Sequence, residues 1–359
     1  MVSDSALARA VDHGLRNHYV TSTSSTYKTA TRDYVSFCNV RSLRPWPVDQ
    51  VTFCGWLHVS ARRIQISSLS MYMAGVRDSS ILLGHGWDLH GNEMVRRSLR
   101  YLKRKYPSKG KGRKVPVTVN VLTKILPLLP GWPDMAAMSA DDRVFACASV
   151  SAVAGFLRGG EFLTARKSTR AVLKARDVTI RVIDGRRAQV IAIPQPKAAW
   201  WVTAQSVPCF QMVPDETFCP VRLWEEYSAR CPGFKPNGPA FLLGDKALTR
   251  DYMVSRTATL VHQAGVSFVD HKGVKMSVKA ASWRSGAVCS AAAAGVPVPY
   301  IMILGRWSSS AWEKLSIASP PCACKEVQVL CGLPQANRPP SPVLWLESST
   351  SALLLGHQL

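Results

Sequence analysis

The stretch from Lys279 to Trp307 reads KAASWRSGAVCSAAAAGVPVPYIMILGRW. After Arg284, a run of small residues from Gly286 to Gly295 predicts a helix that packs closely enough to be buried. A guanidinium on a buried helix is costly unless it meets an anion. Arg284 together with an indole donor on the next element could grip one phosphate from two sides. The alternative at this point is a core helix that carries a surface arginine.

The charge of the whole chain favours an anionic partner. The sequence has 45 Lys and Arg residues against 23 Asp and Glu, which gives a formal net charge of +22 spread over most of its 359 residues. Such an imbalance predicts a polyanionic partner, most often nucleic acid. No run of 18 or more apolar residues occurs, so we expect no membrane partner. The N-terminus shows no secretory pattern, and we expect an intracellular protein.

The ten cysteines are scattered without the spacing of metal ligands. In a reducing compartment they are most simply buried thiols. Cys322, Cys324 and Cys331 are too close together and too few for a zinc site. We therefore expect neither a metal nor a cofactor.

Residues 1–108 are predicted to form a helical domain. Apolar residues recur at helical spacing from residue 4 to residue 106. Ser24 with Ser25, and Ser67 with Ser68, stand where N-caps belong for two of these helices. No catalytic constellation occurs in this part of the chain.

A dense run of basic residues follows. Between Asn92 and Lys114 there are ten Lys or Arg residues and one acid. The Pro-, Gly- and Lys-rich composition predicts a flexible linker at 109–115. A charged run is often only a solvated face, but the density here favours contact with DNA phosphates. The candidate DNA-binding residues are Arg96, Arg97, Arg100, Lys103, Arg104, Lys105, Lys109, Lys111, Arg113 and Lys114.

The second predicted domain spans residues 116–317. Helical patterns cover Val119–Leu129 and Asp134–Leu163, and two further helices are predicted at Val221–Ala229 and Tyr252–Ala264. Between these helical patterns lies a β signal. Val178, Ile180 and Val182 alternate, Asp184-Gly185 forms a hairpin turn, and a second strand contains Val190, Ile191 and Ile193. A turn at Pro194–Lys197 leads to a third predicted strand, Trp200–Val207.

Four features in this order resemble the tyrosine recombinase family, which includes phage integrases and Xer-type recombinases. They are Arg158 with Glu161, Lys197 in a β-turn, Arg284, and Trp307 twenty-three residues later. The local sequences FLRGGEF, SWRSGAV and LGRWSSSAW are similar to those of recombinases from eukaryotic mobile elements of the DIRS and crypton types. The resemblance covers residues 24–317. It implies a nuclear protein.

The resemblance also implies roles for individual residues. Arg158 and Arg284 would hold the scissile phosphate, and Glu161 would buttress Arg158. Lys197 would protonate the leaving 5′ oxygen, and Trp307 would donate its indole N–H to a phosphate oxygen. Transfer at a phosphate needs these functions and an in-line nucleophile. In this family the nucleophile is a tyrosine, which forms a 3′-phosphotyrosyl bond without metal or ATP.

The sequence departs from the family pattern at two places. The usual His-x-x-Arg reads Ala281-Ser282-Trp283-Arg284, so alanine replaces the general base. His271, thirteen residues before Arg284, is the alternative candidate for the general base. The position of the nucleophile is occupied by Leu315 or Ser316. No tyrosine follows Tyr300 in the sequence, and Tyr300 itself is more simply interpreted as a packing residue.

The composition changes abruptly in residues 318–359. This segment has six prolines and three cysteines, and its only basic residues are Lys325 and Arg338. One hypothesis is that a frameshift or a misassigned exon replaced the authentic C-terminus. The alternative is a genuine tail that is mostly disordered.

Together these features predict a mainly helical α+β fold in two domains, with a small antiparallel sheet, clamped around double-stranded DNA. The implied function is site-specific DNA recombination and integration, with a homo-oligomer assembled on DNA. The alternative is a catalytically inactive DNA-binding remnant. An RNA-binding structural protein would account for the charge alone, but not for the order of Arg158, Lys197, Arg284 and Trp307.

Overall fold

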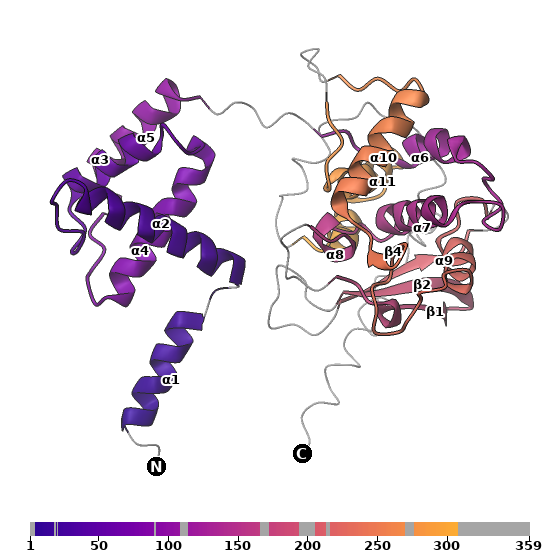
Figure 1. The fold of residues 1–359 in the computed structure, drawn as a ribbon, viewed down its shortest axis with the longest axis horizontal. Coiled ribbons are helices and arrows are strands. Elements are labelled where there is room, and N and C mark those ends of the chain that lie inside the picture. The colour runs from indigo at the N-terminus through magenta and orange to yellow at the C-terminus, as the bar shows by residue number, and fades with distance from the viewer. Residues whose placement is uncertain are drawn as a thin grey trace. The chain divides into compact units, whose positions relative to one another are not determined.

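The structure is a computed structural model that describes residues 4–17, 19, 21–89, 91–107, 114–165, 172–193, 205–212, 216–269 and 276–307. The chain divides into two compact units, Met1–Lys111 and Gly112–Leu359, and each is described by itself (Figure 1). In the described part of the chain, no helix is long and apolar enough to cross a membrane.

The N-terminal unit is helical throughout its described residues. Its helices are α1 (Asp4–Asn17), α2 (Thr21–Asn39), α3 (Gln50–Ser60), α4 (Ile66–Leu82) and α5 (Glu93–Lys105). The core of the unit is aromatic, with Tyr34, Phe53 and Trp56 in edge and tilted contacts. Helix α2 packs closely on α4, because Gly75 has no side chain to separate it from Tyr27. These helices share one hydrophobic core.

Two predicted helix starts are wrong. Helix α2 begins at Thr21, so Ser24 and Ser25 lie inside it. Helix α4 begins at Ile66 with Gln65 at the N-cap, and the backbone N–H of Ser68 already donates to the carbonyl oxygen of Gln65 (2.8 Å). Serine is a preferred N-cap residue, but tertiary packing decides where a helix begins.

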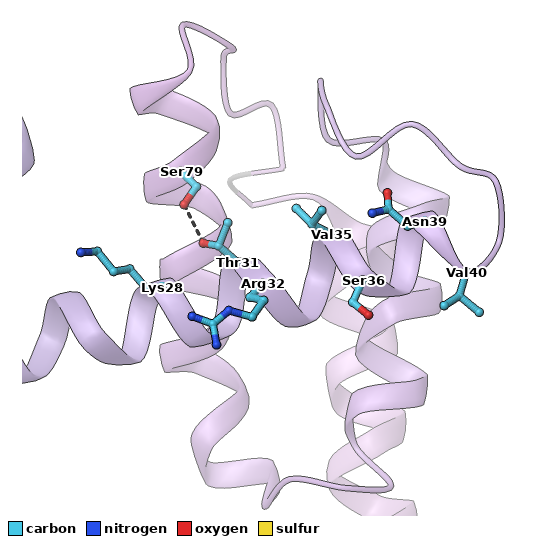
Figure 2. A pocket seen from close by; sticks show the side chains of 8 residues that line it. All are labelled: Lys28, Thr31, Arg32, Val35, Ser36, Asn39, Val40 and Ser79. Carbon is cyan, nitrogen blue, oxygen red and sulfur yellow. Dashed lines mark hydrogen bonds between the residues drawn. The ribbon is translucent and has the colours of Figure 1, made fainter.

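A groove of about 490 Å³ runs along α2 where it meets α4 (Figure 2). Thr31 and Ser79 join the two helices across it through their hydroxyls, which lie 2.6 Å apart. Lys28 and Arg32 give the groove a basic rim. The lining residues are Lys28, Thr31, Arg32, Val35, Ser36, Asn39, Val40 and Ser79.

The C-terminal unit combines helices with two small sheets. Its elements are α6 (Val119–Ile125), η1 (Leu126–Leu128), α7 (Ala140–Ala154), α8 (Gly159–Phe162), η2 (Ala175–Asp177), β1 (Val178–Ile183), β2 (Arg186–Ile193), β3 (Gln205–Phe210), α9 (Pro220–Ala229), β4 (Leu242–Leu243), β5 (Lys246–Ala247), α10 (Arg250–Gln263), α11 (Ser282–Ala293) and α12 (Val298–Gly305). Helices α7 and α11 lie at its centre and carry much of the core.

The larger sheet is antiparallel with strand order β1-β2-β3. Asp184 and Gly185 both have positive φ and close the β1–β2 hairpin, which confirms the predicted turn. Strand β3 continues beyond the predicted end at Val207 to Phe210. It tolerates Pro208 because it is an edge strand of this sheet.

The helical region predicted from Asp134 to Leu163 is interrupted. Helix α7 ends at Ala154, and α8 begins only at Gly159. Phe156 in the connection has a φ of 49°, which no continuous helix allows. This interruption turns two backbone carbonyls, those of Gly155 and Phe156, toward other elements of the unit.

The predicted burial of the small-residue helix, Gly286 to Gly295, is confirmed as far as Ala291, and Ala292 and Gly295 are exposed. Residues Ser282 to Ala291 of α11 are all buried. A Cβ added at Gly286 would overlap the backbone carbonyl of Val117, so the small residues let another chain segment cross at contact distance. The break after α11 ends at Pro297, which is the N-cap of α12. The apolar run that follows, Val298–Gly305, is helical.

Candidate functional site

Arg284 lies in the first turn of α11, and its side chain reaches the α7–α8 connection. Only 5% of the residue is exposed. Its Nη1 donates to the carbonyl oxygen of Phe156 at 2.7 Å, and its Nη2 donates to the carbonyl oxygen of Gly305 at the end of α12. Three elements far apart in sequence therefore meet at this guanidinium.

Arg158 and Glu161 lie at the start of α8 and form an ion pair. Arg158 Nη1 donates to Glu161 Oε1 at 2.9 Å, and the backbone N–H of Arg158 donates to Glu161 Oε2 at 2.7 Å. The Glu161 side chain is 2% exposed, whereas 22% of the Arg158 side chain reaches solvent. The three-residue spacing seen in the sequence thus produces a contact, and Arg158 is the part of it that a ligand can reach.

Arg306 is a third guanidinium in this cluster, and the sequence analysis did not assign it a role. It follows α12 in the left-handed conformation, with φ 54° and ψ 50°. Its Nη2 donates to Glu161 Oε2 (2.9 Å) and to the carbonyl oxygen of Phe156 (3.2 Å). Its Nη1 donates to the carbonyl oxygen of Gly155 (3.2 Å). The only sequence signal was a charge placed directly after an apolar run.

Trp307 covers Arg284. The Cζ atom of Arg284 lies 4.0 Å from the centre of the Trp307 ring, which is a cation–π contact. The ring also folds back on Gly305, where an added Cβ would overlap it. Arg284 and Trp307, which the resemblance assigns to one phosphate, are therefore in direct contact.

The cluster carries excess positive charge in a buried place. Among the described residues that make these contacts, Arg158, Arg284 and Arg306 are cations and Glu161 is the one anion. Burial, then the Arg158 and Arg306 charges, lower the pKa of Arg284 to about 9, although Glu161 opposes them. At neutral pH the guanidinium is still charged. An anion would relieve the cost of that charge.

Lys114 belongs to this neighbourhood rather than to the exposed basic run. It pairs with Ser277 in a parallel bridge, and the next backbone N–H, that of Val115, donates to the Ser277 carbonyl oxygen (3.0 Å). Its side chain is half-buried. Burial lowers the pKa of Lys114, and the positive charge of Arg284 acts in the same direction.

The basic side chains of α5 are exposed in the N-terminal unit. Glu93 forms ion pairs with Arg96 (3.1 Å), Arg97 (3.0 Å) and Arg100 (2.6 Å). These contacts, Arg97 foremost, lower the pKa of the Glu93 carboxyl. Lys103, Arg104 and Lys105 continue the exposed surface. Helix α5 is thus suited to contact a phosphate backbone.

Several residues proposed from the sequence lie outside the described residues. They are Lys197, Lys109, Lys111, Arg113, His271, Leu315, Ser316 and the segment 318–359. Ala281 is exposed at the N-cap of α11, and Tyr300 is half-buried against the core.

The described cysteines are mostly buried, and no disulfide is found among them. Burial raises the pKa of the Cys147 thiol, which favours its neutral form. No group of three or more His, Cys, Asp or Glu residues that could hold a metal ion occurs in the described ranges. Cys322, Cys324 and Cys331 lie outside those ranges.

Solved structures of tyrosine recombinases share this fold. XerH site-specific recombinase bound to palindromic difH substrate, in a post-cleavage complex, matches with a TM-score of 0.51 and 15% identity, over 88% of this chain and 80% of that chain. The XerH pre-cleavage complex matches with a TM-score of 0.51 and 14% identity, over 89% and 83%. Lambda integrase (residues 75–356) bound to DNA matches with a TM-score of 0.47 and 13% identity, over 95% of this chain and 100% of that chain.

No family model matches the sequence, and no curated protein matches it. At these identities, the likeness to XerH establishes the fold alone. The chain has a mainly helical fold with small antiparallel sheets, as in tyrosine recombinases, over most of its length.

Proposed function

We propose that this chain is a recombinase-like protein that binds duplex DNA and grips one backbone phosphate with Arg158, Arg284 and Trp307. The observation that carries the proposal is the buried cluster of three guanidiniums with a single carboxylate. A site of this charge and burial favours an anion. The XerH structures of the same fold contain DNA substrates, which supports DNA as the source of that anion.

The two arginines suit a phosphate for different reasons. Arg158 is the partly exposed member of the cluster, so its guanidinium N–H groups can point toward a ligand. Glu161 meanwhile accepts a hydrogen bond from the Arg158 backbone N–H and fixes its position. Trp307 stacks on the face of the Arg284 guanidinium, so a phosphate would approach the in-plane N–H donors at its edge. Guanidinium forks bind phosphate oxygens with two parallel hydrogen bonds.

The exposed face of α5 provides non-specific affinity in this proposal. Six basic side chains of α5 are exposed, and each one that meets a phosphate would release counterions. They are Arg96, Arg97, Arg100, Lys103, Arg104 and Lys105. Lys109, Lys111, Arg113 and Lys114 extend the same run in the sequence. Binding by this surface is expected to depend steeply on salt.

The finer proposal is an origin in a mobile-element recombinase that acts in site-specific integration in the nucleus, as an oligomer on DNA. The local sequences FLRGGEF and SWRSGAV support this origin, because they resemble those of mobile-element recombinases. Strand transfer would also need Lys197 as general acid and an in-line nucleophile. Because Leu315 and Ser316 occupy the nucleophile position, we assign phosphate binding, and not strand cleavage, to this chain.

The test is the affinity of the full chain for a mixed-sequence DNA duplex, measured by fluorescence anisotropy. Arg158→Gln removes the accessible guanidinium, and Arg230→Gln removes an exposed arginine of the same unit as a matched control. Loss of a charged hydrogen bond of about 1.5–3 kcal/mol predicts a Kd at least about tenfold weaker for Arg158→Gln. Equal affinities for the wild type and both variants would overturn the phosphate grip.

A further inference from the structure

Arg306 holds the α7–α8 connection and the end of α12 together with one side chain. Resting on the phosphate grip proposed above, we infer that Arg306 is the positioning residue that locks Arg158 and Arg284 into a single preorganised cluster. Three acceptors on two elements receive its hydrogen bonds: the carbonyls of Gly155 and Phe156 and the carboxylate of Glu161.

The link from Arg306 to Arg158 runs through Glu161. One carboxylate oxygen, Oε2, accepts from both Arg306 Nη2 (2.9 Å) and the backbone N–H of Arg158 (2.7 Å). The other oxygen, Oε1, is thereby turned toward Arg158 Nη1 (2.9 Å). Without Arg306, the carboxylate would keep only its two hydrogen bonds from Arg158. Arg306 therefore sets the direction in which Arg158 presents its remaining donors.

The link from Arg306 to Arg284 runs through Phe156. The Phe156 carbonyl oxygen accepts from Arg284 Nη1 (2.7 Å) and from Arg306 Nη2 (3.2 Å). Phe156 is held at a positive φ, a conformation that costs free energy in a bulky residue and needs support from its surroundings. Arg306, 150 residues later in the sequence, supplies that support.

The backbone of Arg306 adds to the same arrangement. Its left-handed conformation reverses the chain after α12, so that the Gly305 carbonyl faces Arg284 while the Arg306 side chain returns to the connection. The Arg306 carbonyl oxygen also lies 3.4 Å from Arg158 Nη2. Both arginines thus contact the segment of residues 305–306.

Exposure and contacts distinguish the role of Arg306 from that of Arg158, the member of the cluster that a ligand can reach. Its side chain is 6% exposed, compared with 22% for Arg158. Both of its Nη atoms already donate to protein acceptors. In the described structure its Nε is buried without a partner. Its two Nη atoms serve three protein acceptors, whereas those of Arg284 serve two backbone carbonyls. A lysine could not replace Arg306, because a single ammonium cannot span three acceptors as a planar fork does.

The experiment measures duplex DNA affinity by anisotropy, at a temperature well below the melting temperature of each full-length variant. The variants are Arg306→Lys, which keeps the charge and removes the fork, Arg158→Gln, and the combination of the two. Arg230→Lys is the matched control on the surface. We expect Arg306→Lys to weaken the Kd by about tenfold, since misplaced donors lose most of a charged hydrogen bond. The double variant is expected to lose less than the product of the two single losses, because only the positioning of Arg284 is left for Arg306 to affect.

A purely structural Arg306 would lower only the melting temperature, so an unchanged Kd for folded Arg306→Lys overturns the inference. Losses that multiply in the double variant overturn it too, because Arg306 would then contact the phosphate itself. If Arg158→Gln binds like wild type, the proposed function fails, whatever Arg306 does. Arg306→Gln, which keeps an amide donor for Glu161, gives the same readout should the lysine variant not fold.

Discussion

The guanidinium of Arg284 lies against the face of the Trp307 indole, with 4.0 Å between Cζ and the ring centre. Arg284 is buried in α11, and Trp307 lies just beyond α12, so the contact joins the two helices that the central stretch encodes. A desolvated cation–π contact contributes about 2 kcal/mol. The ring face of Trp307 can therefore hold Arg284 in place, in addition to any hydrogen bond that the indole N–H donates.

Substitution of Trp307 separates these two roles. Trp307→Phe keeps an aromatic face over Arg284 and removes the indole N–H, whereas Trp307→Ala removes both. We expect DNA affinity to fall about tenfold in Trp307→Ala and much less in Trp307→Phe, because stacking of up to about 2 kcal/mol is lost only in the first. Anisotropy titrations of the two variants measure this. Equal losses would show that the indole N–H carries the effect.

Gly286 should tolerate no side chain. An added Cβ would overlap the carbonyl of Val117, a backbone atom that cannot move aside easily. Gly286→Ala is expected to destabilise the chain by at least about 1–3 kcal/mol, the usual cost of overpacking. Gly14→Ala is the control, since a Cβ there meets nothing within 4 Å and the helix position favours alanine. Urea unfolding followed by circular dichroism would detect the difference, and equal stability of both variants would contradict the packing described.

Glu93 competes with DNA for the arginines of α5. Its carboxylate pairs with Arg96, Arg97 and Arg100, so a phosphate must displace it or share them. We expect Glu93→Gln to bind duplex DNA about threefold more tightly at low salt, with the gain shrinking as salt screens the charges. Asp251→Asn, which removes an exposed acid paired with Arg250, is the control. Weaker binding by Glu93→Gln would mean that the carboxylate preorganises the arginines instead.

Limited proteolysis tests the division into two units. The boundary falls between Lys111 and Gly112, inside the Lys- and Gly-rich sequence that follows α5. Lys103 and Lys105 lie in α5, so we expect trypsin to cut the free protein first between Lys105 and Lys114. Bound DNA is expected to protect the same sites. Mass spectrometry of the fragments locates the cut, and a resistant link in the free protein would argue against separable units.

No covalent adduct with DNA is expected from this chain. A serine hydroxyl at position 316 is a far weaker acid than a phenol of pKa about 10, and alanine replaces the usual base. Leu315→Tyr with Ala281→His should restore part of the reaction, since Ala281 is exposed at the start of α11 and has room for an imidazole. Adding Arg284→Ala should abolish the gain.

A denaturing gel after incubation with nicked duplex shows the outcome as a protease-sensitive band. An adduct from the unmodified chain, mapped to any residue, would show that another side chain supplies the nucleophile.

Local patterns in the sequence were enough to predict much of this fold. The small residues from Gly286 to Gly295 predicted a buried helix, because only small side chains let another segment approach so closely. Asp184-Gly185 predicted the hairpin, because few other pairs accept positive φ at both positions. The spacing of Arg158 and Glu161 placed them within one turn, where they form an ion pair. Each of these features depends on neighbours in the chain.

The role of Arg306 could not be predicted in the same way. Its acceptors lie about 150 residues earlier, on a connection that exists only because α7 stops at Ala154 and Phe156 turns left-handed. The only local sequence signal for the end of α7 and for the left-handed Phe156 is Gly155. The sequence by itself therefore determined the elements and the charged residues that they carry. Only tertiary packing decided which guanidiniums share the one carboxylate, because that depends on where distant backbone carbonyls come to lie.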